Sequence, residues 1–300
     1  MEKSIGSDKL KAYLSLHFCV LVWGFTAILG KLISLQALPL VWWRVLLCSI
    51  VLVFIIPLRA VRQMDRRVLG QLVLIGCLIG VHWVCFYGAI KLSNASVAVA
   101  TMATTAFFSA LTEPWLLGRR VKWYELALGI LILPGMGLVI GNISWSMKIG
   151  FGVGTVGAFL AAVFTALNKK VLDNHPPPPL VMSFVELFSG FCITSVFMPF
   201  LLWHAPQTAV LPNLQDWAWL LLLAWGCTLL PHYLTLKAMR HISAFATNLT
   251  INLEPVYGVF LAVLLFREDK ELSPGFYVGV GIILIAVFGH PLLKKIFDKD

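Results

Sequence analysis

Two short segments, FTAILGK (Phe25–Lys31) and FTALNKK (Phe164–Lys170), follow one pattern and begin 139 residues apart. Each segment lies inside a long apolar run and ends on a lysine. A match of this length arises by chance in so hydrophobic a chain. The sequence around the two segments therefore decides whether the two halves of the protein are related.

The similarity continues beyond these segments. LPLVWWRVLL, from Leu38, aligns with PPLVMSFVELF, from Pro178, and two inserted residues place Glu186 opposite Arg44. AIKLSNASVAVATMATTAFFSALTEPWLLGRR, from Ala89, aligns with AMRHISAFATNLTINLEPVYGVFLAVLLFRED. Both halves then close with a charged turn and a glycine-bearing apolar run. The sequence therefore predicts a repeated unit of five apolar segments.

The composition is that of a chain that lies in a lipid bilayer. Of the 300 residues, 59% are hydrophobic and 12% are charged, and the mean hydropathy is +0.88. A soluble domain carries about 25% charged residues. Apolar runs of about 20 residues, long enough to cross a bilayer as helices, recur along the chain. We predict an all-α polytopic membrane protein with ten transmembrane helices, at residues 12–34, 40–58, 68–90, 94–117, 122–142, 150–171, 180–203, 215–238, 243–266 and 273–293, with a tight hairpin at KLSN between the third and fourth.

The basic residues predict the orientation of the chain. If the N-terminus is cytoplasmic, seventeen lysines and arginines lie on that side and five on the other. Because an excess of Lys and Arg marks the cytoplasmic side, we expect both termini inside, with residues 1–11 and 294–300 as short tails, in a plasma membrane and specifically a bacterial inner membrane. The inner set is Lys3, Lys9, Lys11, Arg59, Arg62, Arg66, Arg67, Arg119, Arg120, Lys122, Lys169, Lys170, Lys237, Arg240, Lys294, Lys295 and Lys299, and the outer set is Lys31, Lys91, Lys148, Arg267 and Lys270.

The odd number of segments in the unit predicts the symmetry. A five-helix unit copied in tandem must enter the membrane upside down the second time. Residues 12–142 and 150–293 are therefore expected to form two inverted repeats around a central cavity. Carriers that alternate access to a site near the midplane have this architecture, and inverted repeats also occur in channels.

These residues resemble the EamA-domain members of the drug/metabolite transporter superfamily. Trp23-Gly24, Lys31, Pro39 and Arg44 have the spacing of that family's opening pattern, and FYGAIKLSNA (86–95) is similar to its third-to-fourth span hairpin. NLEPVYG (252–258) and LLFRE, with the glycine-rich last span, are similar to its closing block. Departures are Ala106, where the first repeat usually has proline, and Arg119, where it usually has glutamate.

The resemblance covers residues 12 to 290 and implies a ten-helix bundle that exports or takes up small metabolites such as amino acids, other amphiphilic solutes or drugs. It implies no nucleotide hydrolysis, and the chain has no GxxxxGK[ST] phosphate loop. We therefore expect a secondary carrier. The alternatives are a channel or a lipid-flipping protein and, with less support, an intramembrane enzyme, for which the paired Asp-rich motifs of a prenyltransferase are lacking.

The cysteines, basic residues and glycines limit which metals, cofactors and partners we expect. The six cysteines fall inside apolar runs with no CxxC pair and no His-Cys cluster at metal spacing, so we expect no metal and no cofactor. The basic residues form no continuous stripe, so we expect no nucleic acid. Small-residue faces for close helix packing, or for a homodimer, are Gly76 with Gly80, Gly137 with Gly141, and Gly275 with Gly279.

Glu254 is the best placed ionisable group. Such groups cost about 2.5–3.5 kcal/mol inside a span and usually face the bundle interior. Glu254 lies near the midplane of the ninth span, where Pro255 removes a backbone donor and loosens the helix. Thr250, Glu254 and Tyr257 share one helical face, and Asn252 lies on a second polar line. We expect Glu254 to bind a substrate amine or a coupling proton, or else to be a packing carboxyl satisfied by a hydroxyl.

The remaining candidates are charged or amphiphilic residues inside spans. Arg44 and Glu186, equivalent by the repeat, are expected toward opposite membrane faces as gating or structural charges. His82 and His232 are expected to relay protons or to be hydrogen-bonded packing residues. Trp23 and Met102 would wall an amphiphilic substrate site or belong to the core. No catalytic residue is expected.

Overall fold

The computed structural model describes residues 2–174, 176–251, 253–270 and 272–297, and every regular element in these ranges is a helix. The elements are α1 (Glu2–Leu32), α2 (Ala37–Ile55), α3 (Leu58–Arg62), α4 (Arg66–Leu92), α5 (Ala95–Met102), α6 (Thr105–Leu117), α7 (Trp123–Gly141), η1 (Trp145–Met147), α8 (Lys148–Asn174), α9 (Pro179–His204), α10 (Leu214–Leu221), η2 (Leu222–Leu229), α11 (Leu230–Ala238), α12 (Ala244–Ile251), α13 (Glu254–Phe266), η3 (Glu268–Lys270) and α14 (Pro274–Phe297).

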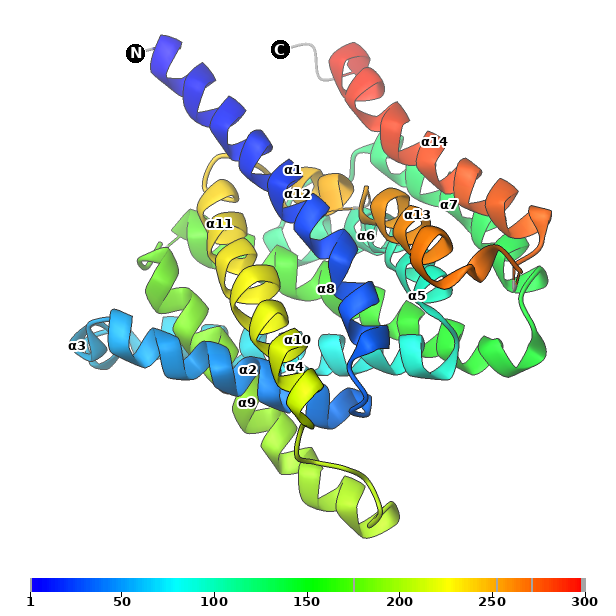
Figure 1. Cartoon of the computed structure of the whole chain (residues 1–300). Helices are drawn as coiled ribbons and strands as arrows, with labels where there is room; N and C mark the ends of the chain where they lie inside the picture. The colour runs from blue at the N-terminus through cyan, green and yellow to red at the C-terminus, as the bar shows by residue number, and fades with distance from the viewer. Residues whose placement is uncertain (1, 175, 252, 271, 298–300) are drawn as a thin grey trace.

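Eight helices in the described ranges are long and apolar enough to cross a membrane. They coincide with the first eight predicted spans, so the multi-pass membrane character is confirmed. The expected ninth and tenth spans contain the shorter apolar stretches Val256–Phe266 and Pro274–Ala286. The ten-helix arrangement therefore stays a prediction. The start of α1 and the end of α14 lie at the same end of the bundle (Figure 1).

The predicted hairpin between the third and fourth spans is present. α4 ends at Leu92 and α5 begins at Ala95. Asn94 is the N-cap of α5, and its side-chain Oδ1 accepts a hydrogen bond from the backbone N–H of Val97 at 2.9 Å. This contact satisfies one of the free amides at the start of a buried helix. The turn therefore needs only two residues.

The fourth span and its counterpart in the second half are both interrupted. α5 ends at Met102 and α6 begins at Thr105, while α12 ends at Ile251 and α13 begins at Glu254. The two helix ends are 149 residues apart, and so are the two helix starts. This distance is the offset between the aligned segments that begin at Ala89 and Ala238. Both second pieces end on a left-handed residue, Gly118 with φ 65° and Arg267 with φ 56°. Two segments with different sequences thus adopt the same interrupted shape.

Glycines let the helices approach closely at some of the predicted faces. A Cβ on Gly76 or Gly80 of α4 would meet the backbone of α9, and a Cβ on Gly279 of α14 would meet the carbonyl of Gly135 of α7 at 2.6 Å. α7 and α14 run side by side at one edge of the bundle (Figure 1). The prediction for Gly137 and Gly141 is wrong within the chain, because both positions face open space.

Candidate functional site

A cavity of about 110 Å³ lies at the centre of the bundle between the two halves of the chain. Such a volume holds a small solute or several water molecules. Both halves contribute charged, polar and aromatic side chains. The lining residues are Trp23, Thr26, Arg44, Ile79, His82, Trp83, Phe86, Met102, Thr105, Ala161, Phe164, Thr165, Asn168, Thr228, His232, Thr235, Leu236, Met239, Ile251 and Glu254.

Arg44 is held rigidly in the cavity wall. Its side chain is 2% exposed, its Nε donates to the hydroxyl of Thr228 at 2.5 Å, and its Nη1 donates to Tyr87 Oη at 3.0 Å. The guanidinium carbon lies 3.9 Å from the centre of the Trp83 ring. A guanidinium has five N–H donors, so further donors remain for a ligand. The contacts described for Arg44 are thus all with side chains of the bundle interior.

Glu254 also lines the cavity, at the first position of α13 and directly after the interruption that separates it from α12. Its side chain is buried. The predicted continuous polar face does not form, because the helix is broken between Ile251 and Glu254. Thr250 donates to the carbonyl of Ala246 at 2.8 Å, and Tyr257 is 37% exposed. Neither residue lines the cavity, and Asn252 lies outside the described residues.

The two histidines occupy opposite walls. His82 is buried on α4, and its Nδ1 lies 2.8 Å from the carbonyl oxygen of Gly157 on α8. His232 on α11 has its Nε2 at 2.8 Å from Oε2 of Glu186 on α9. Glu186 is 0% exposed and does not line the cavity itself. The expectation that Arg44 and Glu186 lie at opposite membrane faces is wrong, because their partners Thr228 and His232 are one turn apart on the same span.

Several residues that line the cavity are related by the offsets of the aligned segments. Trp23 and Met102, which we expected in the wall, both line the cavity. Met102 and further lining residues form pairs whose members are separated by 149 or 139 residues, the offsets of the aligned segments. A site on a pseudo-two-fold axis is lined in this way. The related pairs are Ile79 with Thr228, Trp83 with His232, Phe86 with Thr235, Met102 with Ile251, Thr105 with Glu254, and Thr26 with Thr165.

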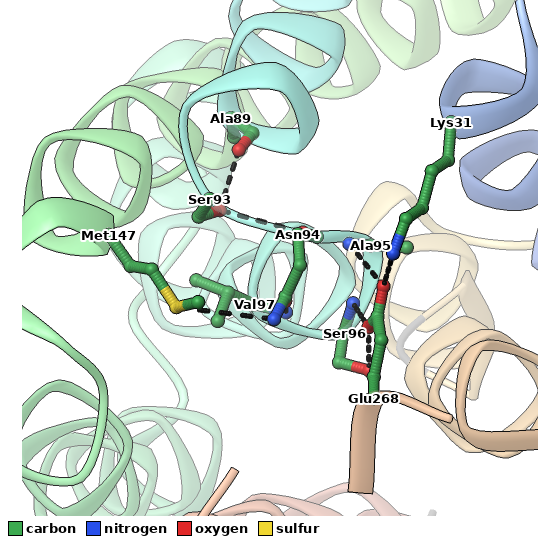
Figure 2. A network of polar contacts seen from close by, with 9 residues as sticks. All are labelled: Lys31, Ala89, Ser93, Asn94, Ala95, Ser96, Val97, Met147 and Glu268. Atoms are coloured by element: carbon green, nitrogen blue, oxygen red, sulfur yellow. Dashed lines mark hydrogen bonds and ion pairs between the residues drawn. The ribbon is translucent and has the colours of Figure 1, made fainter. Parts of the chain in front are cut away.

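One end of the bundle is closed by a network around Glu268, shown in Figure 2. The Glu268 carboxylate is 0% exposed and accepts a hydrogen bond from Lys31 Nζ at 2.7 Å. It also accepts from the backbone N–H of Ala95 at 3.3 Å, and from the N–H and hydroxyl of Ser96 at 3.0 and 2.6 Å. Glu268 therefore joins the end of α1 and the end of α13 to the positive N-terminus of α5.

Further contacts strengthen this end, which we call the Lys31 end. Lys91 Nζ donates to the carbonyl of Ile33 at 2.6 Å, and the backbone N–H of Ser34 donates to the buried Asp216 at 2.7 Å. Within the described part of the chain, none of these residues lines the cavity. The cavity instead extends along α8 and α11 toward Asn168 and Met239, away from the Lys31 end.

The opposite end carries a more open network. Arg119, which the repeat offset aligns with Glu268, bonds Glu113 at 3.2 Å and Asp173 at 3.0 Å, and Lys169 bonds Asp173 at 2.7 Å. The side chains of Arg119 and Asp173 are 46% and 37% exposed. Position 119 thus carries a positive and exposed side chain, whereas the equivalent position 268 carries a negative and buried one.

Several cavity residues were not singled out from the sequence. Thr26 and Thr165 belong to the repeated string FTA, so that repeat is the signal that would have found them. Phe164 belongs to the same string, whereas Trp83 and Thr228 carry no motif, since aromatic and hydroxyl residues are common in any membrane helix. Taken together, a guanidinium, a carboxyl, two imidazoles and aromatic rings suit a small amphiphilic solute with charged groups of both signs.

The comparisons with known proteins agree with a transporter. The model for the EamA-like transporter family matches residues 10–141 and again residues 148–290. The "Uncharacterized transporter YetK" of Bacillus subtilis (strain 168) is 23% identical over 312 residues, which are 96% of this chain and 88% of that protein. A solved structure described as "Crystal structure of protein" has a TM-score of 0.69 and 16% identity, covers 95% of this chain and 98% of its own, and shares the fold alone.

Proposed function

This chain belongs to the EamA-like transporter family, and from that premise we propose that it is a secondary-active carrier of small amphiphilic metabolites, in particular amino acids. The carrier works by alternating access to the central cavity and exports or exchanges its substrate. A channel or a lipid-flipping protein is the alternative, and an intramembrane enzyme has less support.

The pairing of Arg44 with Glu254 in one small cavity carries this proposal. A guanidinium binds a carboxylate in a fixed geometry, and a buried carboxylate binds an ammonium group. Trp23, Trp83 and Phe86 supply apolar and aromatic surface beside these charges. An amino acid with a large side chain presents all three features together, so it fits the cavity better than a simple amine or a simple acid.

Alternating access is supported by the two ends of the bundle. The Lys31 end is closed by the buried Glu268 network, while the cavity extends toward the opposite end. Ten spans in two inverted repeats, residues 12–142 and 150–293, account for the repeat-related cavity pairs. With both termini cytoplasmic, the Lys31 end is extracellular and the cavity opens to the cytoplasm. A plasma membrane, specifically a bacterial inner membrane, is the proposed location, and a homodimer remains an expectation.

A counterflow assay in proteoliposomes tests the proposal. Vesicles are loaded with unlabelled L-phenylalanine, and the entry of labelled L-phenylalanine is compared with that of benzylamine and phenylacetate. We expect saturable counterflow for L-phenylalanine and weak flux for the other two, since each can pair with only one of the two charges. Glu254→Gln and Arg44→Gln are expected to reduce the counterflow at least about tenfold, because each removes a charge-assisted hydrogen bond of about 1.5–3 kcal/mol.

Glu113→Gln is the matched control, because Glu113 is a buried carboxyl of α6 that does not line the cavity. It is expected to keep counterflow. Flux that rises linearly with concentration and shows no counterflow would favour a channel. Scrambling of a fluorescent lipid in the same vesicles would favour a lipid-flipping protein. Full activity of Glu254→Ala at every pH would remove Glu254 from the site.

A further inference from the structure

We propose that Glu186 and His232 form a proton-binding site whose occupancy is linked to the filling of the central cavity. This inference rests on the proposed carrier function and adds to it the ion that drives the transport. The proton lies between Nε2 of His232 and Oε2 of Glu186, which are 2.8 Å apart.

The environment of the pair favours a proton over a permanent ion pair. Glu186 is 0% exposed, and its second oxygen, Oε1, is buried and accepts no hydrogen bond from the described residues. A structural carboxylate is expected to satisfy both oxygens, since a buried unpaired one is costly. Here the carboxyl is satisfied on one side only, by the imidazole of His232.

His232 connects the pair to the cavity. Its side chain lines the cavity and is 12% exposed, whereas Glu186 lies behind it. A proton on the imidazole is therefore hydrated only from the cavity, and a solute that fills the cavity changes this hydration and adds its own charges. The affinity for the proton must then depend on the solute and, by reciprocity, the affinity for the solute must depend on the proton.

The other titratable and charged groups near the pair do not replace this proton. On the helices packed against α9 and α11, most are thiols or side chains bonded elsewhere, and Arg44 is the charged group that shares the cavity wall. Among the side chains that the structure describes, these groups are Arg44 and Cys48 on α2, Arg59 and Arg62 on α3, Arg66, Arg67, Cys77, His82, Cys85, Tyr87 and Lys91 on α4, Asp8, Lys9, Lys11, Tyr13, His17, Cys19 and Lys31 on α1, Cys192 and His204 on α9, Cys227 on η2, and Tyr233 and Lys237 on α11.

The balance of charge supports the same conclusion. Arg44 brings one positive charge to the cavity region, while Glu254 and Glu186 bring two carboxyl groups. A region closed off from water strongly disfavours a net charge. One proton on the Glu186–His232 pair restores neutrality when both carboxyls are ionised. A sodium ion suits the pair less well, because hard cations prefer several oxygen ligands and one carboxylate oxygen already faces a nitrogen.

The first test needs no transport assay. Purified protein carrying ¹⁵N-histidine is titrated by NMR, and His232→Gln identifies the His232 signal. We expect that signal to change with pH, to move when L-phenylalanine is added, and to change in Glu186→Gln. The signal of His82, whose ring nitrogen meets a backbone carbonyl, is the internal control and should not respond to Glu186→Gln. A His232 signal that keeps one protonation state throughout would overturn the proposal.

The second test separates coupling from transport. A pH difference of one unit across the vesicle membrane is expected to drive accumulation of labelled L-phenylalanine, up to about tenfold for one proton per solute. Glu186→Gln should keep counterflow within about threefold while losing this accumulation, and Glu113→Gln should keep both. Wild-type counterflow without any response to pH, or accumulation driven by a sodium gradient instead, would overturn the proton site. Absence of wild-type counterflow would refute the proposed substrate, and the NMR titration would still decide the proton site.

Discussion

The replacement Glu268→Gln is expected to open the Lys31 end of the bundle. Glutamine keeps the shape of the side chain and removes its charge. It also turns one acceptor oxygen into an NH₂ group that faces the donors of Lys31, Ala95 and Ser96. The closed arrangement loses the negative charge and the hydrogen bonds to that one oxygen, whereas an arrangement in which α1 and α13 have moved away from α5 loses nothing. The substitution therefore shifts the balance between the two.

The size of the shift follows from the contacts. A carboxylate at a partly buried helix N-terminus contributes about 1–2 kcal/mol. The Lys31 side chain is 34% exposed, so its ion pair is screened by water, and such a pair contributes no more than about 1 kcal/mol. Together these give about 1–3 kcal/mol, which is a change of about 5- to 160-fold in the ratio of open to closed molecules.

Labelling of a cavity cysteine measures this ratio. Thr26→Cys places a thiol in the cavity wall, in a background where the six native cysteines are replaced. A membrane-impermeant maleimide is applied from each side of oriented vesicles. We expect slow labelling from the Lys31 side in the parent protein and a rate about 5- to 160-fold higher with Glu268→Gln, if labelling follows the open population.

Two variants check the cause. Lys31→Met should raise the rate less than Glu268→Gln, because the contacts of Glu268 with Ala95 and Ser96 remain. The exchange Lys31→Glu with Glu268→Lys restores the ion pair but cannot restore the contacts with α5, since lysine accepts no hydrogen bond. We therefore expect the double exchange to bring the labelling rate only part of the way back to that of the parent protein. If Glu268→Gln leaves the labelling rate within threefold of the parent, the network does not hold the cavity closed.

Three further outcomes are expected. Gly135→Ala should lower the melting temperature in detergent by several degrees, because its Cβ would lie 2.7 Å from the carbonyl oxygen of Gly279, at a cost of about 1–3 kcal/mol. Gly137→Ala is the control and should leave the melting temperature unchanged, because position 137 faces open space. Equal effects of the two variants would contradict the close packing of α7 against α14. Arg44→Lys should raise the KM for L-phenylalanine counterflow about tenfold or more by losing the planar donor fork, and an unchanged KM would remove Arg44 from the site. Asn94→Ala should lower stability by about 1 kcal/mol through loss of the α5 cap without changing that KM, and an unaltered melting curve would show that the cap is dispensable.

The first eight spans and the loosened helix beside Glu254 could be predicted from the sequence. Long apolar runs bounded by charges predict membrane helices because the bilayer sets their length. Pro255 indicated a loosened helix beside Glu254, and a break lies there between Ile251 and Glu254. The matching break between Met102 and Thr105 was not predicted, because Ala106 stands where a proline would have signalled it. That interruption follows from packing in the folded bundle rather than from a local helix breaker.

The pairing of Glu186 with His232 could not be predicted, for a geometric reason. The two residues are 46 positions apart on different helices, so their contact depends on how each helix is rotated about its axis. The eighth span contains a π-helical stretch, Leu222–Leu229, directly before α11. Each π turn takes up an extra residue and rotates everything after it relative to an ideal α-helix. A wheel drawn with 3.6 residues per turn therefore places His232 on the wrong face.

The unequal ends of the bundle indicate what the solute and the proton must do. At the opposite end the side chains of Arg119 and Asp173 are 46% and 37% exposed, while that of Lys169 is 9% exposed, and exposed ion pairs contribute about 0–1 kcal/mol each. The network of Glu268 at the Lys31 end is buried, and it contributes about 1–3 kcal/mol by the reasoning above. In the proposed carrier, the Lys31 end is therefore the end that stays closed when no solute is bound. Opening that end requires a comparable free energy from elsewhere, and binding in the cavity, where Arg44, Glu254 and His232 meet the solute, is the available source. A carrier whose two ends were equally strong would need no such contribution, and its labelling from the two sides would be alike.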